Sequence, residues 1–297
     1  MAGRRRKKSG GRSYAWRYRG RIVACVFVEV IIICALVIMI GWNKGVKEWF
    51  EQFEQPVLKE VDISGINSPN AILMQARGGK ILGEINGEAQ IYPASMTKIM
   101  TVILGIENFD DLDEKITLTD EMFSGLYEQD ATQAGFQPGE EVRVIDLLYG
   151  AMLPSGAECC IALADTISGS EADFAELMNK KARKLGMENT HFCDSTGLHN
   201  PDHYSTVKDI AVLMKYCIKN DTFREIVETS RHSTGVTNIH PDGITYYSTM
   251  FKNLSDPTVT GGKILGGKTG YTSEAGHCLV SFAEIEGREY IFVSAGA

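Results

Sequence analysis

Little in this sequence would hold a metal ion or build a disulfide framework. The 297 residues include six histidines and seven cysteines, and no pair of cysteines has the spacing of a zinc site. Two cysteines lie in an apolar run near the N-terminus, which leaves Cys159, Cys160, Cys193, Cys217 and Cys278. Because five is odd and two of these are adjacent, a disulfide framework is excluded and one disulfide stays open. We interpret most of the five as small buried residues.

Basic residues are also scarce beyond the first residues of the chain. Nine of the 30 lysines and arginines precede residue 22, so 21 remain beyond residue 41, against 37 acidic residues. The net charge of this larger part is therefore about −16. Since nucleic-acid binding requires a basic surface, no nucleic-acid partner is expected.

One long apolar run is present, at residues 22–40, and only Glu29 interrupts it. A helix of that length nearly spans a bilayer core, and the basic flank predicts a cytoplasmic N-terminus. We expect a basic cytoplasmic segment (1–21), a single-pass transmembrane signal anchor in the lipid bilayer (22–41), a stalk (42–67) and an extracellular domain (68–297). A cleaved signal peptide is the competing interpretation, but the run is longer than usual and no small-x-small site follows it.

The large domain alternates between strand patterns at its ends and helical patterns in its middle. Residues 71–76 and 80–85 flank Arg77-Gly78-Gly79 and predict a β-hairpin. Helical patterns follow at 99–106 and 144–152, and capping boxes at Ser170 and Thr206 begin two more helices. The strand patterns near the end are 263–270, 277–283 and 290–294. This order predicts an α+β fold in which the terminal strands share an antiparallel sheet around a helical insertion.

Residues 92–98, Tyr-Pro-Ala-Ser-Met-Thr-Lys, precede the apolar helix and contain a possible nucleophile. If the helix begins near Ser95, Lys98 lies one turn further on the same face, within reach of the serine hydroxyl. A lysine withdrawn from water loses proton affinity and can accept the serine proton. On these residues alone the alternative is equally good: a capped core helix whose lysine extends to solvent.

The spacing of a serine and a lysine recurs at residues 205–208, Ser-Thr-Val-Lys. There Thr206 is explained as a helix cap, and Lys208 falls on an exposed first turn. We therefore do not expect Ser205 to be a nucleophile.

Two later segments contain further residues that could act with Ser95 and Lys98. Ser155-Gly156-Ala157 lies at a turn between helices, and Lys268-Thr269-Gly270 lies on a predicted strand. In this order the three resemble the S-x-x-K, S-x-N and K-T-G motifs of penicillin-recognising serine acyl-transferases. Residues 93–101, 194–198, 203–206 and 267–272 also resemble the D-alanyl-D-alanine carboxypeptidases of the low-molecular-mass penicillin-binding group. The likeness runs from about residue 71 to the last and implies a β-lactamase/DD-peptidase-like fold.

The resemblance implies roles for the catalytic residues. Ser95 would attack the D-alanyl-D-alanine carbonyl, Lys98 would take its proton, and Ser155 would relay a proton to the leaving D-alanine. Peptidoglycan stem peptides are then the substrates and β-lactams the covalent inhibitors. The family needs no metal or cofactor, so His199 and His203 are interpreted as loop residues rather than ligands.

The same resemblance implies a substrate-binding strand. Lys268 would supply positive charge beside Ser155, and Thr269 would hold the terminal carboxylate of the substrate. The amides of Ser95 and Tyr271 would form the oxyanion hole. Gly270 would let the substrate approach the strand edge.

The chain departs from the family pattern at Ala157, where the second motif normally ends in Asn. Losing its hydrogen bonds costs on the order of 1.5–3 kcal/mol each, unless a neighbour such as Glu158 replaces them. A catalytically weakened wall protein that binds penicillin or peptidoglycan is therefore one alternative. A β-lactamase of the same fold is a weaker one, because no carboxylate motif for deacylation is evident.

A second departure is at the C-terminus, where the family normally continues into a helix; we expect a fragment or a shortened form. The sequence leaves open whether the enzyme serves cell-wall maintenance and cell shape or antibiotic resistance to glycopeptides.

Overall fold

The computed structural model describes residues 60–254 and 256–297. Within this part of the chain no helix is long and apolar enough to cross a membrane. The predicted anchor at 22–41 and the basic segment before it lie outside the described residues. Both remain predictions.

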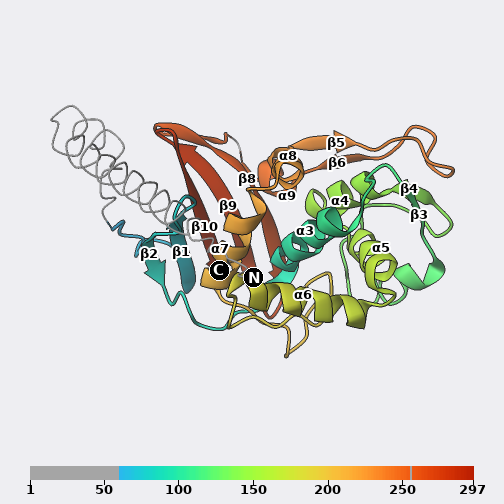
Figure 1. Cartoon of the computed structure of the whole chain (residues 1–297). Coiled ribbons are helices and arrows are strands. Elements are labelled where there is room, and N and C mark those ends of the chain that lie inside the picture. The colour runs from blue at the N-terminus through green and yellow to red at the C-terminus, as the bar shows by residue number, and fades with distance from the viewer. Residues whose placement is uncertain (1–59, 255) are drawn as a thin grey trace, which may run out of the picture. The chain divides into compact units, whose positions relative to one another are not determined.

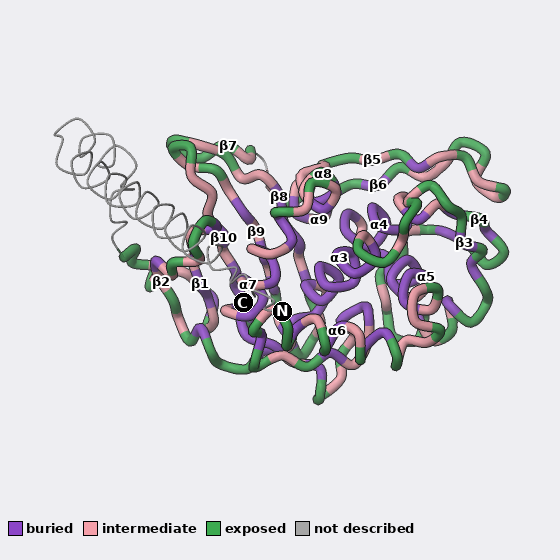
Figure 2. The backbone as a smooth tube through the Cα atoms, viewed as in Figure 1, coloured by how far each residue is buried: buried purple, intermediate pink, exposed green. Residues whose placement is uncertain are grey.

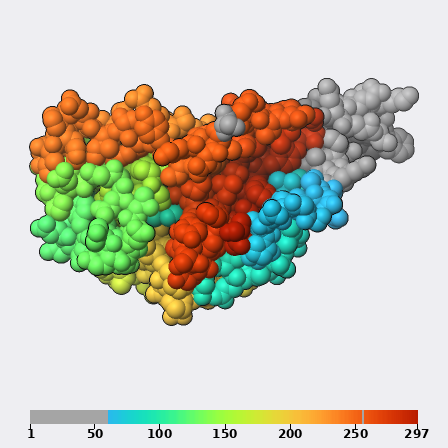
Figure 3. All heavy atoms as spheres, turned by 180° about the vertical axis from the view of Figure 1, so that it is seen from behind, coloured from blue at the N-terminus to red at the C-terminus, as the bar shows by residue number. Residues whose placement is uncertain are grey.

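A six-stranded antiparallel sheet joins the two ends of the described chain, in the order β2-β1-β10-β9-β8-β7 (Figure 1). Its strands are β1 (Asn70–Gln75), β2 (Ile81–Ile85), β7 (Thr258–Val259), β8 (Gly262–Thr272), β9 (Gly276–Ile285) and β10 (Arg288–Ala295). The pairing of β1 with β10 confirms the prediction that the terminal strands share one sheet. Seen from behind, the last strands lie between the first hairpin and the helical residues (Figure 3).

The predicted hairpin at residues 71–85 is confirmed by the antiparallel pairing of β1 and β2. Gly78 and Gly79 in its turn have φ values of 82° and 74°, a region that favours glycine because other residues carry a Cβ. The two glycines therefore allow the tight turn that the sequence indicated.

The segment between β2 and β7 is mainly helical, which confirms the α+β prediction. It contains η1 (Ala94–Thr97), α3 (Lys98–Asn108), β3 (Lys115–Thr117), η2 (Asp120–Phe123), β4 (Glu141–Arg143), α4 (Val144–Met152), α5 (Ala157–Ser168), α6 (Glu171–Leu185), α7 (Val207–Cys217), α8 (Asp221–Glu228), β5 (Arg231–Ser233), β6 (Thr245–Tyr247) and α9 (Thr249–Lys252). The predicted caps are present, since Ser170 and Thr206 accept hydrogen bonds from the amides of Asp173 and Asp209.

Helix α3 forms the centre of the helical part. All residues from Lys98 to Gly105 are buried, and the helix packs against α4, α5 and α7 (Figure 2). Because the stretch from Ile99 to Gly105 is covered on every side, it is apolar all round apart from Thr101. Helix α7 packs against β1 and β10 and so connects the helical part to the sheet.

The structure corrects the predicted start of the helix that carries the proposed nucleophile. Ser95 lies in the 3₁₀ helix η1, and the α-helix begins only at Lys98. Short 3₁₀ turns are common at helix N-termini, and periodicity does not distinguish them from the first turn of an α-helix. The difference matters because side chains three residues apart eclipse one another in a 3₁₀ turn.

Candidate active site

The η1 turn brings the proposed nucleophile and base together. The Nζ atom of Lys98 lies 3.0 Å from the Oγ atom of Ser95, within hydrogen-bonding distance. Ser95 is half-buried, whereas Lys98 is only 4% exposed. The three-residue spacing in the sequence therefore becomes a direct contact, as predicted.

Lys98 has one further hydrogen-bond partner, the carbonyl oxygen of Thr196, at 2.7 Å from Nζ. Burial lowers the pKa of the Lys98 amine, and the nearby acidic groups, Asp194 and Glu158 among them, oppose this only in part. A neutral amine has two N–H donors and one lone pair. It can donate to Thr196 and accept the proton of Ser95 at the same time.

Ser155 lies on the other side of the nucleophile. Its Oγ donates to the Oγ of Ser95 over 3.0 Å. Ser155 has a φ of 74°, in the left-handed region that costs a non-glycine residue roughly 1–2 kcal/mol. Ser155 lies in the short turn between α4 and α5, and this strained conformation directs its hydroxyl at Ser95.

The Lys268-Thr269-Gly270 motif lies on β8, next to the η1 turn. A Cβ atom added to Gly270 would lie 3.0 Å from the amide nitrogen of Ser95, so the strand touches the nucleophile turn backbone to backbone. Lys268 is 1% exposed, and its Nζ donates to the carbonyl of Thr269 over 2.8 Å. Burial, with a contribution from the charge of Lys98, places the pKa of Lys268 well below its usual value.

A cleft of about 900 Å³ opens over these residues. It is lined by five of the seven predicted site residues: Ser95, Ser155, Thr269, Gly270 and Tyr271. The remaining two, Lys98 and Lys268, are buried beneath its floor residues. All seven positions are thus gathered at one place in the fold.

Thr249 also lines the cleft and was not identified from the sequence. Its Oγ1 lies 2.7 Å from the Oγ1 of Thr269, so the two hydroxyls form a pair facing the same cavity. Thr249 opens the four-residue helix α9, which is too short to leave a periodic pattern. Only the cap formed by Ser248 marks this helix in the sequence.

Ala157, the departure from the family pattern, begins helix α5 and is 1% exposed. Its amide donates to the carbonyl of Thr132 over 2.8 Å. The carboxylate of Glu158 accepts from the amides of Ala134 and Gly135, at 2.6 and 2.9 Å. Glu158 therefore holds a neighbouring loop, and no hydrogen bond from Lys98 to it is present among the described residues.

The second serine–lysine pair is structural, as predicted. Ser205 is fully buried and hydrogen-bonds the hydroxyl of Thr190 over 2.8 Å. Lys208 forms an ion pair with Glu88 at the surface. Neither residue lines the cleft described above.

All five cysteines of the described residues are free, so the disulfide left open by the sequence does not form among them. Over the same residues no three His, Cys, Asp or Glu side chains are grouped as metal ligands would be. His199 lines the cleft, and its ring contacts Tyr92 edge to face. His203 is buried at 2% exposure and has hydrogen-bond partners on two segments, which its interpretation as a simple loop residue missed.

The chain is similar in sequence to known D-alanyl-D-alanine carboxypeptidases. A family model described as D-alanyl-D-alanine carboxypeptidase matches residues 57–297. The D-alanyl-D-alanine carboxypeptidase DacF of Bacillus subtilis is 35% identical over 230 residues, which are 77% of this chain and 57% of that protein. The carboxypeptidase DacC of Escherichia coli is 33% identical over 262 residues, 80% of this chain and 58% of that protein. The chain thus spans little more than half the length of these relatives.

Among solved structures, the crystal structure of a DD-transpeptidase from Streptomyces is similar, with a TM-score of 0.71 and 30% sequence identity. The match covers 80% of this chain and 92% of that structure.

Proposed function

Because the chain belongs to the D-alanyl-D-alanine carboxypeptidase family, we propose that it is a serine D,D-carboxypeptidase that removes the terminal D-alanine from peptidoglycan stem pentapeptides through an acyl-enzyme. One observation supports this most: the Oγ of Ser95 lies 3.0 Å from both the Nζ of Lys98 and the Oγ of Ser155. A hydroxyl held between a buried amine and a second hydroxyl is arranged for proton transfer in both directions.

Acylation begins when neutral Lys98 accepts the proton of Ser95 and the serine oxygen attacks the carbonyl of the penultimate D-alanine. The amides of Ser95 and Tyr271 stabilise the negative charge that develops on the carbonyl oxygen. Ser155 gives its proton to the nitrogen of the leaving D-alanine as the peptide bond breaks, and the protonated Lys98 returns a proton to Ser155. Water then hydrolyses the ester and restores the hydroxyl of Ser95.

Recognition of the terminal carboxylate falls to the strand and helix across the cleft. The hydroxyls of Thr269 and Thr249 both face the cavity and can each donate a hydrogen bond to a carboxylate oxygen. Lys268 lies under this end of β8 and favours a negatively charged ligand when it is protonated. β-Lactams, which carry a carboxylate near a strained amide, would be bound in the same way.

Labelling with a fluorescent penicillin tests the proposal. The wild type should form a covalent adduct, and Ser95→Ala should form none because the attacking oxygen is absent. Ser205→Ala is the matched control, since it removes the serine of the other serine–lysine pair and should leave labelling intact. An unlabelled but folded wild type would contradict the acyl-enzyme mechanism.

Release of D-alanine from a stem pentapeptide then separates the enzyme from its alternatives. A carboxypeptidase releases one D-alanine per turnover, whereas a binding protein becomes labelled without sustained release. A β-lactamase would instead turn over penicillin rapidly and accumulate little adduct.

We also propose that residues 22–41 anchor the protein in the membrane with residues 1–21 in the cytoplasm. The length of the apolar run and the basic residues before it support this. The full chain should stay with membranes after alkaline washing, and a chain lacking residues 2–41 should not. N-terminal sequencing of the mature protein distinguishes an uncleaved anchor from a cleaved signal peptide.

A further inference from the structure

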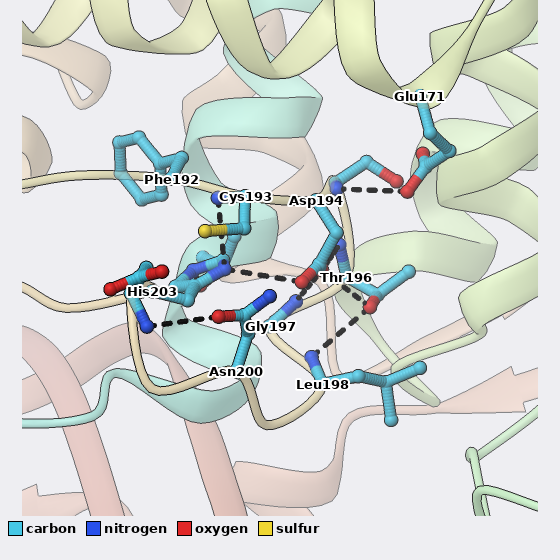
Figure 4. Close-up of polar contacts among 12 residues, drawn as sticks. Glu171, Phe192, Cys193, Asp194, Thr196, Gly197, Leu198, Asn200 and His203 are labelled. Carbon is cyan, nitrogen blue, oxygen red and sulfur yellow. Dashed lines mark hydrogen bonds and ion pairs between the residues drawn. The ribbon is translucent and has the colours of Figure 1, made fainter.

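Figure 4 shows the loop at residues 194–198 with its hydrogen bonds. This loop lies directly against the turn that carries Ser95. Gly197 has a φ of 81°, and a Cβ added to it would lie 1.9 Å from the carbonyl oxygen of Ala94. The hydroxyl of Thr101, one turn into α3, donates to the carbonyl of Ser195 over 2.5 Å. The loop and the start of α3 are therefore in contact at two points.

Asp194 determines the shape of this loop. Its Oδ1 accepts three hydrogen bonds of 2.7 Å each, from the amide and hydroxyl of Thr196 and from the amide of Gly197. This turn fixes the peptide group whose carbonyl accepts from Lys98 at 2.7 Å. The loop thus supplies the acceptor that the catalytic amine needs.

His203 connects Asp194 back to the nucleophile turn. Its Nδ1 lies 3.1 Å from the Oδ2 of Asp194, and its Nε2 lies 2.9 Å from the hydroxyl of Thr97. Burial opposes ionisation of Asp194, but the hydrogen bonds from His203 and Thr196 outweigh it and lower the pKa of Asp194 to about 2. The amide nitrogen of Cys193 also lies 3.3 Å from Nδ1. Because an ionised carboxylate only accepts and Asp194 is the nearer partner, we assign the proton to Nδ1, and Nε2 then accepts from the hydroxyl of Thr97.

These contacts form a closed ring around the catalytic amine. Thr97 is the neighbour of Lys98 in the chain, Lys98 bonds Thr196, Thr196 bonds Asp194, and Asp194 bonds His203, which returns to Thr97. We propose that Asp194 and His203 are positioning residues for acylation: through the Thr196 carbonyl they orient the Lys98 amine so that its lone pair faces Ser95. This inference rests on the proposed function.

The orientation matters because an amine can rotate about its Cε–Nζ bond. One N–H group held by the Thr196 carbonyl restricts that rotation and leaves the lone pair directed at Ser95. The charged and titratable groups around the amine are Asp194, Glu158, Cys159, Cys160 and Lys268. Among these, only Asp194 is bonded to the segment that carries the acceptor carbonyl.

Two variants break the ring without touching Ser95 or Lys98. His203→Ala removes the bridge, and Thr97→Val removes one buried hydroxyl with little change in volume. Thr97→Ser keeps the hydroxyl and serves as the rescue. His232→Ala is the matched control, because it removes another histidine that pairs with an aspartate, here Asp146 at 3.0 Å. Neither His232 nor Asp146 lines the cleft.

The readout is the rate of acylation by a fluorescent penicillin between pH 5 and pH 10, with urea unfolding of each variant as the measure of folding. We expect His203→Ala and Thr97→Val to be acylated about tenfold more slowly at the pH where the rate is highest. The pH range over which the rate rises should also differ from that of the wild type. Thr97→Ser and His232→Ala should stay within about twofold of the wild type.

Wild-type rates and pH profiles in folded Thr97→Val and His203→Ala would overturn the inference. If His203→Ala does not fold, Thr97→Val and Thr97→Ser decide it. A wild type that is not acylated at all would instead contradict the proposed function.

Discussion

Two lysines lie beneath the nucleophile, and both are withdrawn from solvent. Lys98 and Lys268 are 4% and 1% exposed, and burial lowers the pKa of each. A buried lysine is a costly residue unless its neutral form has a use. At Lys98 the use that we propose is the acceptance of the Ser95 proton.

The lowered pKa of Lys98 predicts how acylation depends on pH. The neutral amine is the proposed active form, so the acylation rate should rise as pH increases through the pKa of Lys98, and burial should move this rise to lower pH than for an ordinary lysine. Lys98→Arg should lose at least about a hundredfold, because a guanidinium stays protonated throughout this range. Acylation rates of both proteins between pH 5 and pH 10 check this, and an active arginine variant would contradict Lys98 as the base.

The contact between Ser95 and Lys98 could be predicted from their spacing, but the two later motifs were assigned to the site only through the resemblance to the carboxypeptidase family. The Thr196 carbonyl could not be predicted in the same way, because any residue has a carbonyl and only the fold directs this one at Lys98. Thr249 was missed for a similar reason, since a single threonine can be recognised as a site residue only when the fold places it opposite Thr269.

Among the secondary-structure elements, the η1 turn and the loop at residues 194–198 pack directly against each other. Gly197 lies where they touch, with a φ of 81° and no room for a side chain. Gly169, which ends α5, has a φ of 82° but nothing within 4 Å of an added Cβ. The two glycines therefore share the same left-handed backbone conformation and differ in packing.

Alanine at each glycine separates these two effects. Gly169→Ala should cost about 1 kcal/mol of unfolding free energy, the penalty of a left-handed conformation. Gly197→Ala should cost roughly 2 kcal/mol more, because its Cβ meets the Ala94 carbonyl, and it should also slow acylation. Urea unfolding measures the loss of stability, and penicillin labelling measures the acylation rate. If the two variants lost the same unfolding free energy, the loop at residues 194–198 would be able to move away from Ala94.

Elements with strong local signals were predicted well, and those held by distant contacts were not. The helices after Ser170 and Thr206 begin where their caps indicate. The short strands β5 and β6 were missed because their residues are mostly exposed and carry no apolar alternation. Their position depends on contacts with α4, such as that of His232 with Asp146.

For the molecule as a whole, Asp146 connects several segments of the helical part. Its carboxylate, 2% exposed, accepts from Arg143, from His232 and from the amide of Gly235. Burial disfavours the ionised carboxylate, but these bonds outweigh it and lower the pKa of Asp146. Asp113 bonds the same arginine but is 76% exposed.

Removing each carboxylate tests how much this connection stabilises the fold. Asp146→Ala should lower the free energy of unfolding by about 3 kcal/mol, because buried donors lose their partner. Asp113→Ala should change it by about 0.5 kcal/mol or less. Penicillin labelling of the folded protein should be unchanged in both variants, since neither residue lines the cleft. If both variants lost a similar unfolding free energy, burial of the carboxylate would not explain how much it stabilises the fold.

The pairing of β1 with β10 also determines when activity can arise during synthesis. Asn70 pairs with Ala295, so two neighbouring strands of the sheet, β1 and β10, come from opposite ends of the described chain. The β8 strand is held against the η1 turn by β9, and β9 by β10, so the site is completed only after the last strand has been made. A ribosome-bound chain that ends before residue 288 should carry Ser95, Lys98 and the Lys268 motif and still not react with penicillin.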